Sequence, residues 1–187
     1  MKKLCRFVIL ILVVVLVCIS FKPVMKIIFP LKYKDIVIKY SEENDVDPFF
    51  IMSIIKAESN FDKDARSSKG ALGLMQVTPS TGEWIAEKIN NSIFINNSIF
   101  EEDNLFDPDI NIRYGTWYIN YLSNKFNGNR NVIIAAYNAG PGSVDKWLND
   151  SNYSQNGEDL DNIPFVETDK YVSKVNFYYN IYKFLYT

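Results

Sequence analysis

DPFFIMSIIKAESNF, residues 47–61, predicts a helix that is buried around much of its circumference. Asp47 is typical of an N-cap and Pro48 of a first helical position, so the helix should begin here. At a repeat of about 3.6 residues one face is apolar, and its members are Ile51, Ile54 and Ile55. Phenylalanine and methionine side chains point to other faces, which indicates that neighbouring segments cover the helix on several sides.

Glu58 continues the same apolar face one turn later. In one interpretation it lies just beyond the buried part with its head group in water, the commoner arrangement for ionisable residues at helix ends. In the other the carboxyl is buried, and desolvation raises its pKa. Such a carboxyl is a proton donor near neutral pH, so the second interpretation predicts a catalytic acid.

Three further sequence blocks follow in order, and they are GALGLMQVTP at 70–79, AAYNAGPG at 135–142 and IPFVETDKYV at 163–172. Together with Glu58-Ser59 they resemble the blocks of the SLT-type lytic transglycosylases, which cleave the glycan strands of bacterial peptidoglycan. Each block alone is weakly specific, whereas four in the right order identify the family. The resemblance covers roughly residues 35–186 and implies a lysozyme-like fold of the goose-type or SLT kind.

The resemblance also implies a reaction at the bond between N-acetylmuramic acid and N-acetylglucosamine. Matched by position, Glu58 would protonate the glycosidic oxygen and then accept the proton of the muramic acid 6-hydroxyl. That hydroxyl attacks C1 and closes a 1,6-anhydro ring, so no water is consumed. The acetamido group of the sugar takes the place of a second carboxylate, and the reaction needs no cofactor or metal.

The candidate substrate-binding residues are Ser59, Met75, Gln76, Tyr137, Asn138, Glu167 and Tyr171. The Gln76 amide suits sugar hydroxyl or acetamido groups, and Met75 forms either an adaptable apolar wall or ordinary core. By resemblance the Tyr137 hydroxyl lies near the catalytic carboxyl, although Tyr137 and Asn138 could instead pack or cap their helix. Ser59 has no base to activate it, so we expect it to fix the end of the helix.

Carboxylates other than Glu58 are open to two interpretations. By resemblance Glu167 contributes to the substrate groove and Tyr171 lines it, but a glutamate at a helix N-terminus is also favourable in itself. Asp62 and Asp64 could supply a second carboxylate for hydrolysis. They lie in a polar stretch, so we expect them to be solvated.

The N-terminal segment resembles an export signal. Lys2, Lys3 and Arg6 precede the apolar or small-residue run Phe7–Phe21. We expect residues 1–31 to be a retained single-helix anchor in the cell membrane, and the less favoured alternative is a cleaved signal that releases the domain. In either case residues 32–187 form the transglycosylase domain outside the cytoplasm.

Composition excludes several other chemistries. The chain has no histidine, and both cysteines lie in the N-terminal segment at Cys5 and Cys18, so Ser-His triads, Cys-His dyads and histidine or cysteine metal sites are excluded from the domain. Without the three N-terminal basic residues, 17 basic residues face 22 acidic ones, a net charge near −5. No basic stripe is present, so we expect no nucleic-acid partner, and we expect a monomer.

The pattern predicts one mainly α-helical domain with no convincing strand. Helices are expected within residues 31–46, from Pro79 to about Ile89, from Pro108, over 131–138, over 144–148 and from about Thr168. Gly115 should permit the close approach of a neighbour. Residues 90–94 and 96–100 repeat the motif NNSIF, which we interpret as an exposed loop insertion or, less favoured, as a pair of substrate-contacting segments.

Three function classes remain open from the sequence. The first is a non-hydrolytic peptidoglycan lyase, the second a hydrolytic muramidase on the same fold, and the third a non-catalytic peptidoglycan-binding component of an envelope assembly. The lyase is favoured by three of the sequence blocks taken together, namely Glu-Ser, Gly-Leu-Met-Gln and Ala-Tyr-Asn. A glutamate on an apolar helix face argues against the non-catalytic class.

Overall fold

The computed structural model describes residues 2–92 and 100–187, and within them it is helical with no strand. Two isolated β-bridges join Leu72 to Arg66 and to Val77. In chain order the elements are α1 (Lys2–Ile28), α2 (Lys34–Glu43), α3 (Pro48–Glu58), α4 (Pro79–Ser92), the 3-10 helix η1 (Glu102–Phe106), α5 (Pro108–Lys125), α6 (Arg130–Ala139), α7 (Pro141–Leu148) and α8 (Val166–Tyr186). Most of the repeated NNSIF motif lies outside the described residues, so its interpretation stays a prediction.

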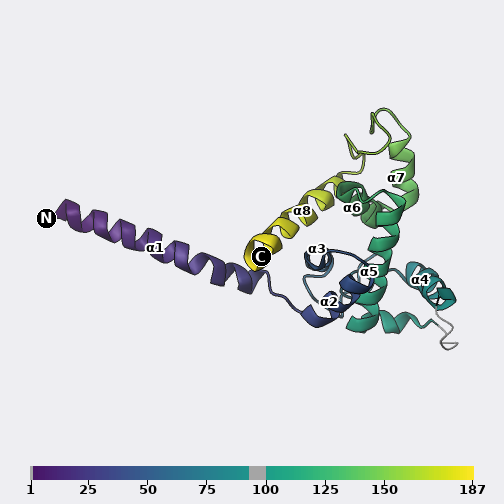
Figure 1. The fold of residues 1–187 in the computed structure, drawn as a ribbon, viewed down its shortest axis with the longest axis horizontal. Helices are drawn as coiled ribbons and strands as arrows, with labels where there is room; N and C mark the ends of the chain where they lie inside the picture. The colour runs from purple at the N-terminus through teal and green to yellow at the C-terminus, as the bar shows by residue number, and fades with distance from the viewer. Residues whose placement is uncertain (1, 93–99) are drawn as a thin grey trace.

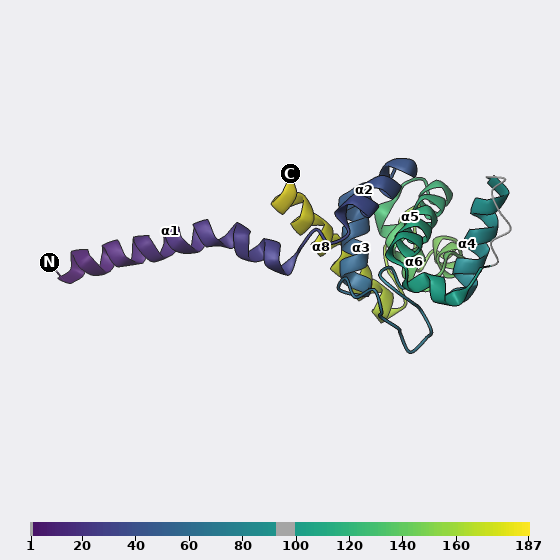
Figure 2. The ribbon, with the colours of Figure 1, turned by 90° about the horizontal axis from the view of Figure 1, so that it is seen from below.

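Helix α3 is the buried centre of the domain. The Asp47 carboxylate accepts a hydrogen bond of 2.8 Å from the Phe49 amide, which confirms the predicted N-cap with proline at the next position. All six residues from Phe50 to Ile55 are buried. Helices α2 and α8 pack against α3, and in Figure 2 all three lie on the side of the domain nearest α1. Because α3 is covered on several sides, its C-terminal end carries Glu58 into the interior.

Local signals place the other helices close to where the sequence predicts them. The Asp107 carboxylate caps α5 through the amides of Asp109 and Ile110. The predicted start of α7 was wrong by three residues: α6 ends at Ala139, Gly140 follows with a φ of 84°, and α7 begins at once with Pro141. Proline fits a first helical position, so the same Gly-Pro pair that ends one helix starts the next.

The block at residues 70–79 forms a compact loop that is held by Asn111 of α5. This asparagine is fully buried, and its side-chain amide donates to the carbonyls of Leu72 at 2.9 Å and Leu105 at 2.7 Å. Its carbonyl oxygen accepts from the Met75 amide at 2.7 Å. Gly115, one turn further along α5, permits the predicted close approach, because a Cβ there would lie 2.3 Å from the Met75 sulfur.

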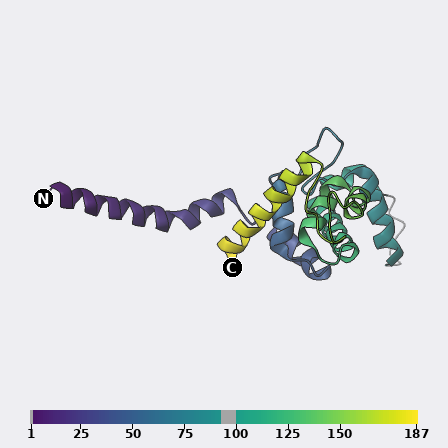
Figure 3. The same cartoon turned by 90° about the horizontal axis from the view of Figure 1, so that it is seen from above.

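Helix α1 extends away from the domain and meets it at the C-terminal part of α8 (Figures 1 and 3). Phe29 follows α1 directly and is 5% exposed, with its ring edge-on to Tyr178 and Tyr182. The Tyr186 hydroxyl donates to the Phe29 carbonyl at 2.7 Å. Phe29 is therefore part of the domain core, although the expected boundary at residue 32 leaves it outside. Over the described part of the chain, no helix has the length and apolar character needed to cross a membrane.

Candidate active site

Glu58 is the last residue of α3 and meets α8 at Tyr171. The Tyr171 hydroxyl donates a hydrogen bond to Glu58 Oε1. Tyr171 is buried and lies on the inner face of α8, one turn after Thr168. The fold thus brings together two residues that lie 113 positions apart in the sequence.

The surroundings of Glu58 favour the neutral form of its carboxyl. Burial raises its pKa from 4.5 to about 7, and this effect outweighs the hydrogen bond from Tyr171 and the charge of Lys174, both of which lower the pKa. The sequence left open whether Glu58 lies in water beyond the helix or is buried, and in the structure the residue is partly buried, with its carboxyl bonded to Tyr171. A carboxyl with its pKa raised in this way holds its proton closer to neutral pH than an exposed glutamate does.

Tyr137 lies near enough to Glu58 for the carboxylate charge to act on its hydroxyl. Its hydroxyl donates to the Met75 carbonyl at 2.8 Å, which joins α6 to the loop at residues 72–77. Burial and the negative charge of Glu58 raise the pKa of Tyr137 well above its usual value, and the same two causes raise the pKa of Tyr171. Both tyrosines therefore stay neutral at physiological pH and remain hydrogen-bond donors beside the carboxyl.

Ser59 and Gln76 tie the loop at residues 72–77 to the end of α3. The Ser59 hydroxyl donates to the Leu74 carbonyl at 2.8 Å, so this residue fixes the helix end, as the sequence suggests. Gln76 has a φ of 51°, and its amide nitrogen donates to the carbonyls of Gly73 at 2.9 Å and Ala65 at 3.2 Å. Because these bonds engage the nitrogen, the amide oxygen is the part of Gln76 that can meet a ligand.

A cavity of about 550 Å³ opens at Glu58. Its lining residues are Ile28, Phe29, Lys56, Ala57, Glu58, Ser59, Asn60, Ala65, Arg66, Ser67, Gln76, Lys174 and Tyr178. Glu58 is the one carboxylate among these residues, which also include the cationic side chains of Lys56, Arg66 and Lys174. Two apolar residues at the end of α1 and just after it form part of the wall, which the sequence did not indicate.

Several predicted binding residues occupy other positions than expected. The Met75 side chain is fully buried against Gly115, so the prediction that it forms a substrate-contacting wall was wrong and its alternative, ordinary core, is what the structure has. Glu167 is exposed and lies 3.4 Å from Lys69 in an ion pair, and it is absent from the described residues that line the cavity. The Asn138 carbonyl oxygen accepts from the Thr168 hydroxyl at 2.8 Å and so holds α6 to the start of α8.

Two residues at the site were not identified from the sequence. Lys174 lines the cavity, lowers the pKa of Glu58 and donates to the Ala57 carbonyl at 2.8 Å. The sequence held one signal for this role: Lys174 lies three residues after Tyr171 on the same helix, and residues with this spacing are neighbours on the helix surface. Asn111 organises the loop at residues 72–77, and a polar residue next to the apolar positions of α5 was the only hint of that role. Asp62 and Asp64 are exposed, as the sequence predicts.

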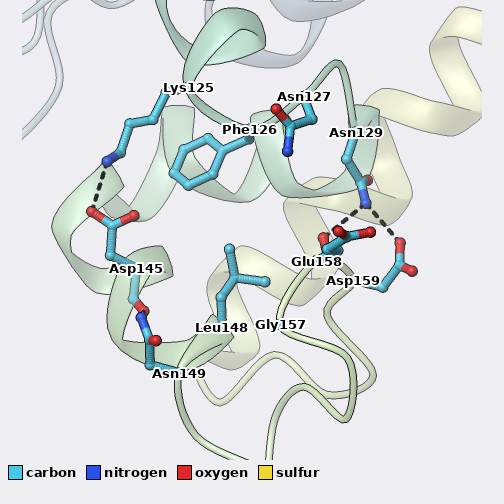
Figure 4. A pocket seen from close by; sticks show the side chains of 10 residues that line it. All are labelled: Lys125, Phe126, Asn127, Asn129, Asp145, Leu148, Asn149, Gly157, Glu158 and Asp159. Carbon is cyan, nitrogen blue, oxygen red and sulfur yellow. Dashed lines mark hydrogen bonds and ion pairs between the residues drawn. The ribbon is translucent and has the colours of Figure 1, made fainter.

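A second cavity, of about 340 Å³, lies between the end of α5, α7 and the loop at residues 149–161 (Figure 4). Lys125 and Asp145 form an ion pair of 2.9 Å on one side. On the other side the Asn129 amide donates to the Asp159 carboxylate at 2.6 Å and to the Glu158 carbonyl at 3.1 Å. These bonds attach the loop to the start of α6, and the cavity shares no lining residue with the one at Glu58.

Comparison with known proteins places the chain in one family. Residues 35–160 match the model described as the transglycosylase SLT domain. The soluble lytic murein transglycosylase of Salmonella typhimurium is 35% identical over 156 residues, which cover 83% of this chain and 23% of that protein. A membrane-bound lytic murein transglycosylase C of Edwardsiella ictaluri is 34% identical over 123 residues, covering 60% of this chain and 32% of that protein.

The fold is shared with a solved relative. The structure of an inactive mutant of lytic transglycosylase Slt from Pseudomonas aeruginosa aligns with a TM-score of 0.72 at 33% identity, over 86% of this chain and 25% of that chain. These matches confirm the predicted helical, lysozyme-like class, and the chain spans about a quarter of the length of the soluble relatives. The chain belongs to the transglycosylase SLT domain family.

Proposed function

We propose that this protein is a peptidoglycan lytic transglycosylase in which Glu58 is first the general acid and then the general base. The observation that carries the proposal is the Glu58 carboxyl itself, which lies at the end of a buried helix, opens on a cavity of about 550 Å³ and has a pKa raised to about 7. A glutamate with this pKa can donate a proton near neutral pH and recover it in the next step. Murein is named as the substrate of both curated relatives, which supports the same substrate here.

The proposed reaction breaks the C1–O4 bond between N-acetylmuramic acid and N-acetylglucosamine and forms a C1–O6 bond within the muramic acid. Protonated Glu58 gives its proton to the leaving oxygen, and the ionised carboxylate then takes the proton from the 6-hydroxyl. Oε1 accepts from Tyr171, so we assign the transferable proton to Oε2. The Tyr171 hydrogen bond stabilises the carboxylate in the interval between the two transfers.

The surroundings of Glu58 support this route over hydrolysis. Hydrolytic enzymes of the inverting kind place a second carboxylate across the bond to activate water. Of the described residues that line the cavity, Glu58 alone carries a carboxylate, and Asp62, Asp64 and Glu167 are exposed. We therefore assign stabilisation of the positive charge at C1 to the acetamido group of the substrate, and its orientation to Gln76, Tyr137 and Asn138.

Digestion of purified peptidoglycan in ¹⁸O-labelled water tests the proposal. We expect muropeptides that end in 1,6-anhydro-N-acetylmuramic acid, one water lighter than hydrolytic products and without label at C1. Glu58→Gln keeps the shape of the side chain but cannot donate a proton, so cleavage should fall by roughly 10²–10⁴-fold while glycan binding persists. Label at C1 would show a hydrolytic muramidase, and unchanged cleavage by Glu58→Gln would remove this residue from the mechanism.

We also propose that residues 1–31 hold the domain at the outer face of the cell membrane. The proposal rests on the basic residues at the start of the chain and on the apolar run Phe7–Phe21. It is also supported by one group of relatives, which are named membrane-bound lytic murein transglycosylases. Fractionation of cells expressing the full chain should recover it with membranes. A mature protein in the culture fluid that begins near Phe21 would instead establish a cleaved signal.

A further inference from the structure

Helix α8 carries an exposed apolar stripe on its C-terminal half. Phe177 and Phe184 are 58% and 56% exposed, and their spacing of seven residues places them on one face of the helix, two turns apart. Asn180, which is also exposed, lies between them on the same face. Large aromatic side chains that are exposed and aligned in this way indicate a surface that meets a partner.

The end of α1 extends this stripe. The Phe21 ring is edge-on to the Phe184 ring, with 6.4 Å between the centroids. The Lys22 ammonium lies 4.7 Å from the centroid of the Phe184 ring, and the Lys26 ammonium lies 4.9 Å from the centroid of the Tyr186 ring. Figures 1 and 3 show the end of α1 beside the C-terminal part of α8. We call this group the aromatic-lysine surface, and its members are Phe21, Lys22, Lys26, Phe177, Asn180 and Phe184.

The two segments that form this surface are basic, although the chain as a whole has a net charge of −2. Residues 22–34 and 170–187 together carry seven lysines, and all 22 acidic residues of the chain lie within residues 35–169. An anionic surface would therefore attract this end of the molecule and repel the rest, which gives the domain one preferred orientation. Because the lysines come from opposite ends of the chain, only the fold brings them together.

Lysine and aromatic side chains in contact match the boundary between lipid headgroups and acyl chains. Aromatic rings lie at the level of the headgroups in membrane proteins, and lysine places its apolar stem along the same level while its ammonium reaches the phosphates. The Lys22–Phe184 and Lys26–Tyr186 contacts hold both kinds of group together. A second copy of this chain fits less well, because the aromatic-lysine surface holds no acidic residue that could face the lysines of the other copy.

We propose that the aromatic-lysine surface docks on the headgroups of anionic phospholipids, and this rests on the proposed attachment of residues 1–31 to the membrane. Helix α1 brings the surface to the bilayer, and the docking fixes the orientation of the helical domain. Lys174 and Tyr178 line the cavity at Glu58 and lie beside Phe177 on α8. Docking therefore holds the cavity close to the bilayer, toward the glycan strands nearest the membrane.

A fluorescent label between the two phenylalanines tests the docking. Cys5 and Cys18, the only cysteines of the chain, are replaced by alanine, and Asn180→Cys in the full chain is labelled with an environment-sensitive fluorophore. The chain is reconstituted into vesicles of phosphatidylcholine, with or without phosphatidylglycerol, that contain a nitroxide-labelled lipid as quencher. We expect quenching and a blue-shifted emission in the vesicles with phosphatidylglycerol. Ser151→Cys, labelled in the exposed loop at residues 149–161, should remain unquenched.

Substitutions on the surface should lower the docked fraction without releasing the chain from the vesicles. Phe177→Ser combined with Phe184→Ser should lower the ratio of docked to undocked domain by roughly ten-fold or more. Lys22→Gln and Lys26→Gln should each lower this ratio roughly five-fold, and only in vesicles with phosphatidylglycerol. Phe165→Ser is the matched control, because Phe165 is 53% exposed at the opposite end of α8 and should leave the quenching unchanged. Circular dichroism and thermal unfolding confirm that each variant is folded.

The docking and the attachment of residues 1–31 fail in different ways. If the chain stays with the vesicles after an alkaline wash but the label at residue 180 is not quenched, the docking is overturned and the attachment stands. If the wash removes the chain, yet quenching at neutral pH depends on Phe177 and Phe184, the surface binds lipid and the attachment is overturned. Quenching that is the same without phosphatidylglycerol would contradict recognition of anionic lipid. Shielding of the label that rises with protein concentration and not with phosphatidylglycerol would show that a second copy covers the surface.

Discussion

At the scale of single residues, the candidate site is a carboxyl whose proton affinity is set by competing contacts. Burial favours the neutral form of Glu58, whereas the Tyr171 hydroxyl and the charge of Lys174 favour the ionised form. The outcome, a pKa of about 7, places the titration of this group in the physiological range. Both the stability of the fold and the pH profile of the reaction should therefore depend on Glu58.

Glu58 should destabilise the fold as the pH rises. The folded chain holds this proton with a pKa of about 7, against an ordinary value of 4.5, so between these pH values the folded state binds more protons than the unfolded state. The free energy of unfolding should consequently fall as the pH rises through this window, by about 3 kcal/mol when complete. Urea unfolding of wild type and Glu58→Gln at about pH 5 and about pH 8 measures the difference.

Glu58→Gln has no titrating carboxyl at this position, so its free energy of unfolding should not fall through this pH window. Above neutral pH it should be more stable than the wild type. Glu167→Gln is the matched control, because Glu167 is exposed and should follow the wild-type pH dependence. An equal fall in stability for wild type and Glu58→Gln would mean that the Glu58 carboxyl is not desolvated.

Tyr171→Phe should move the pH profile of cleavage to higher pH. The substitution removes the hydrogen bond that lowers the pKa of Glu58, so the acid keeps its proton further into the alkaline range. The alkaline limb of kcat/KM should shift upward, and the maximal rate should fall because the carboxylate formed in the first step loses its donor. Tyr153→Phe, which removes a hydroxyl in the loop at residues 149–161, should leave the limb in place. A limb that stays or moves down would exclude Tyr171 as the group that sets this pKa.

At the scale of elements, the site depends on how closely α5 approaches the loop at residues 72–77. Met75 fills the space above Gly115 with its side chain, while its backbone amide and carbonyl bind Asn111 and Tyr137. The Ser59 hydroxyl connects the same loop to the end of α3. A displacement of Met75 would therefore be transmitted to Ser59, next to Glu58, and to Tyr137.

Gly115→Ala should destabilise the domain in spite of the better helix propensity of alanine. The new Cβ would lie 2.3 Å from the Met75 sulfur and 2.9 Å from its Cβ, and overpacking of this kind costs about 1–3 kcal/mol, more than the propensity gain of about 1 kcal/mol. Chemical denaturation measures the change. Combined with Met75→Ala, the loss should be smaller than the sum of the two single changes, because the clash with the Met75 sulfur is removed.

Gly142→Ala is the matched control for that prediction. Gly142 lies in the first turn of α7, and a Cβ there meets no atom within 4 Å. The substitution should leave the free energy of unfolding unchanged or raise it slightly. Stabilisation by Gly115→Ala would contradict the close approach between α5 and Met75.

At the scale of the whole molecule, the segment that follows α1 is packed into the helical domain. Phe29 packs between aromatic rings of α8, and the Lys56 ammonium donates to the Ile28 carbonyl at 2.8 Å. Ile28 and Phe29 also line the cavity at Glu58. The end of α1 therefore lies beside both the cavity and α8, and Figures 1 and 3 show α1 meeting the domain at α8.

A truncated chain that begins at Lys32 should be less stable than one that begins at Val24. The shorter chain lacks Phe29, whose buried side chain contributes roughly 1.5–3 kcal/mol, and it opens one wall of the cavity. We expect a lower Tm and a higher KM for glycan cleavage. Phe29→Ala in the longer chain should reproduce most of the loss. Equal Tm and KM for the two truncated chains would show that this contact does not support the domain.

The sequence by itself determined the helical class, the capped starts of α3 and α5, and the identity of Glu58 as the candidate acid. These follow from short-range rules, since Asp-Pro pairs and the spacing of apolar residues act within a few turns of one helix. The four sequence blocks also identified the family, because their order along the chain can be read from the sequence alone. The start of α7 was missed because Gly140 and Pro141 were interpreted only as the end of the preceding helix, whereas Pro141 also begins the next one.

Only the tertiary structure decided what surrounds Glu58 and what Met75 does. Whether a carboxyl at a helix end is in water or buried depends on α8, which begins more than a hundred residues later and brings Tyr171 and Lys174 to it. Met75 is core rather than wall because Gly115 leaves space beneath it, a complementarity between two segments that neither one encodes alone. The cavity wall at Phe29 arises in the same way, from side chains that are distant in sequence and adjacent only after packing.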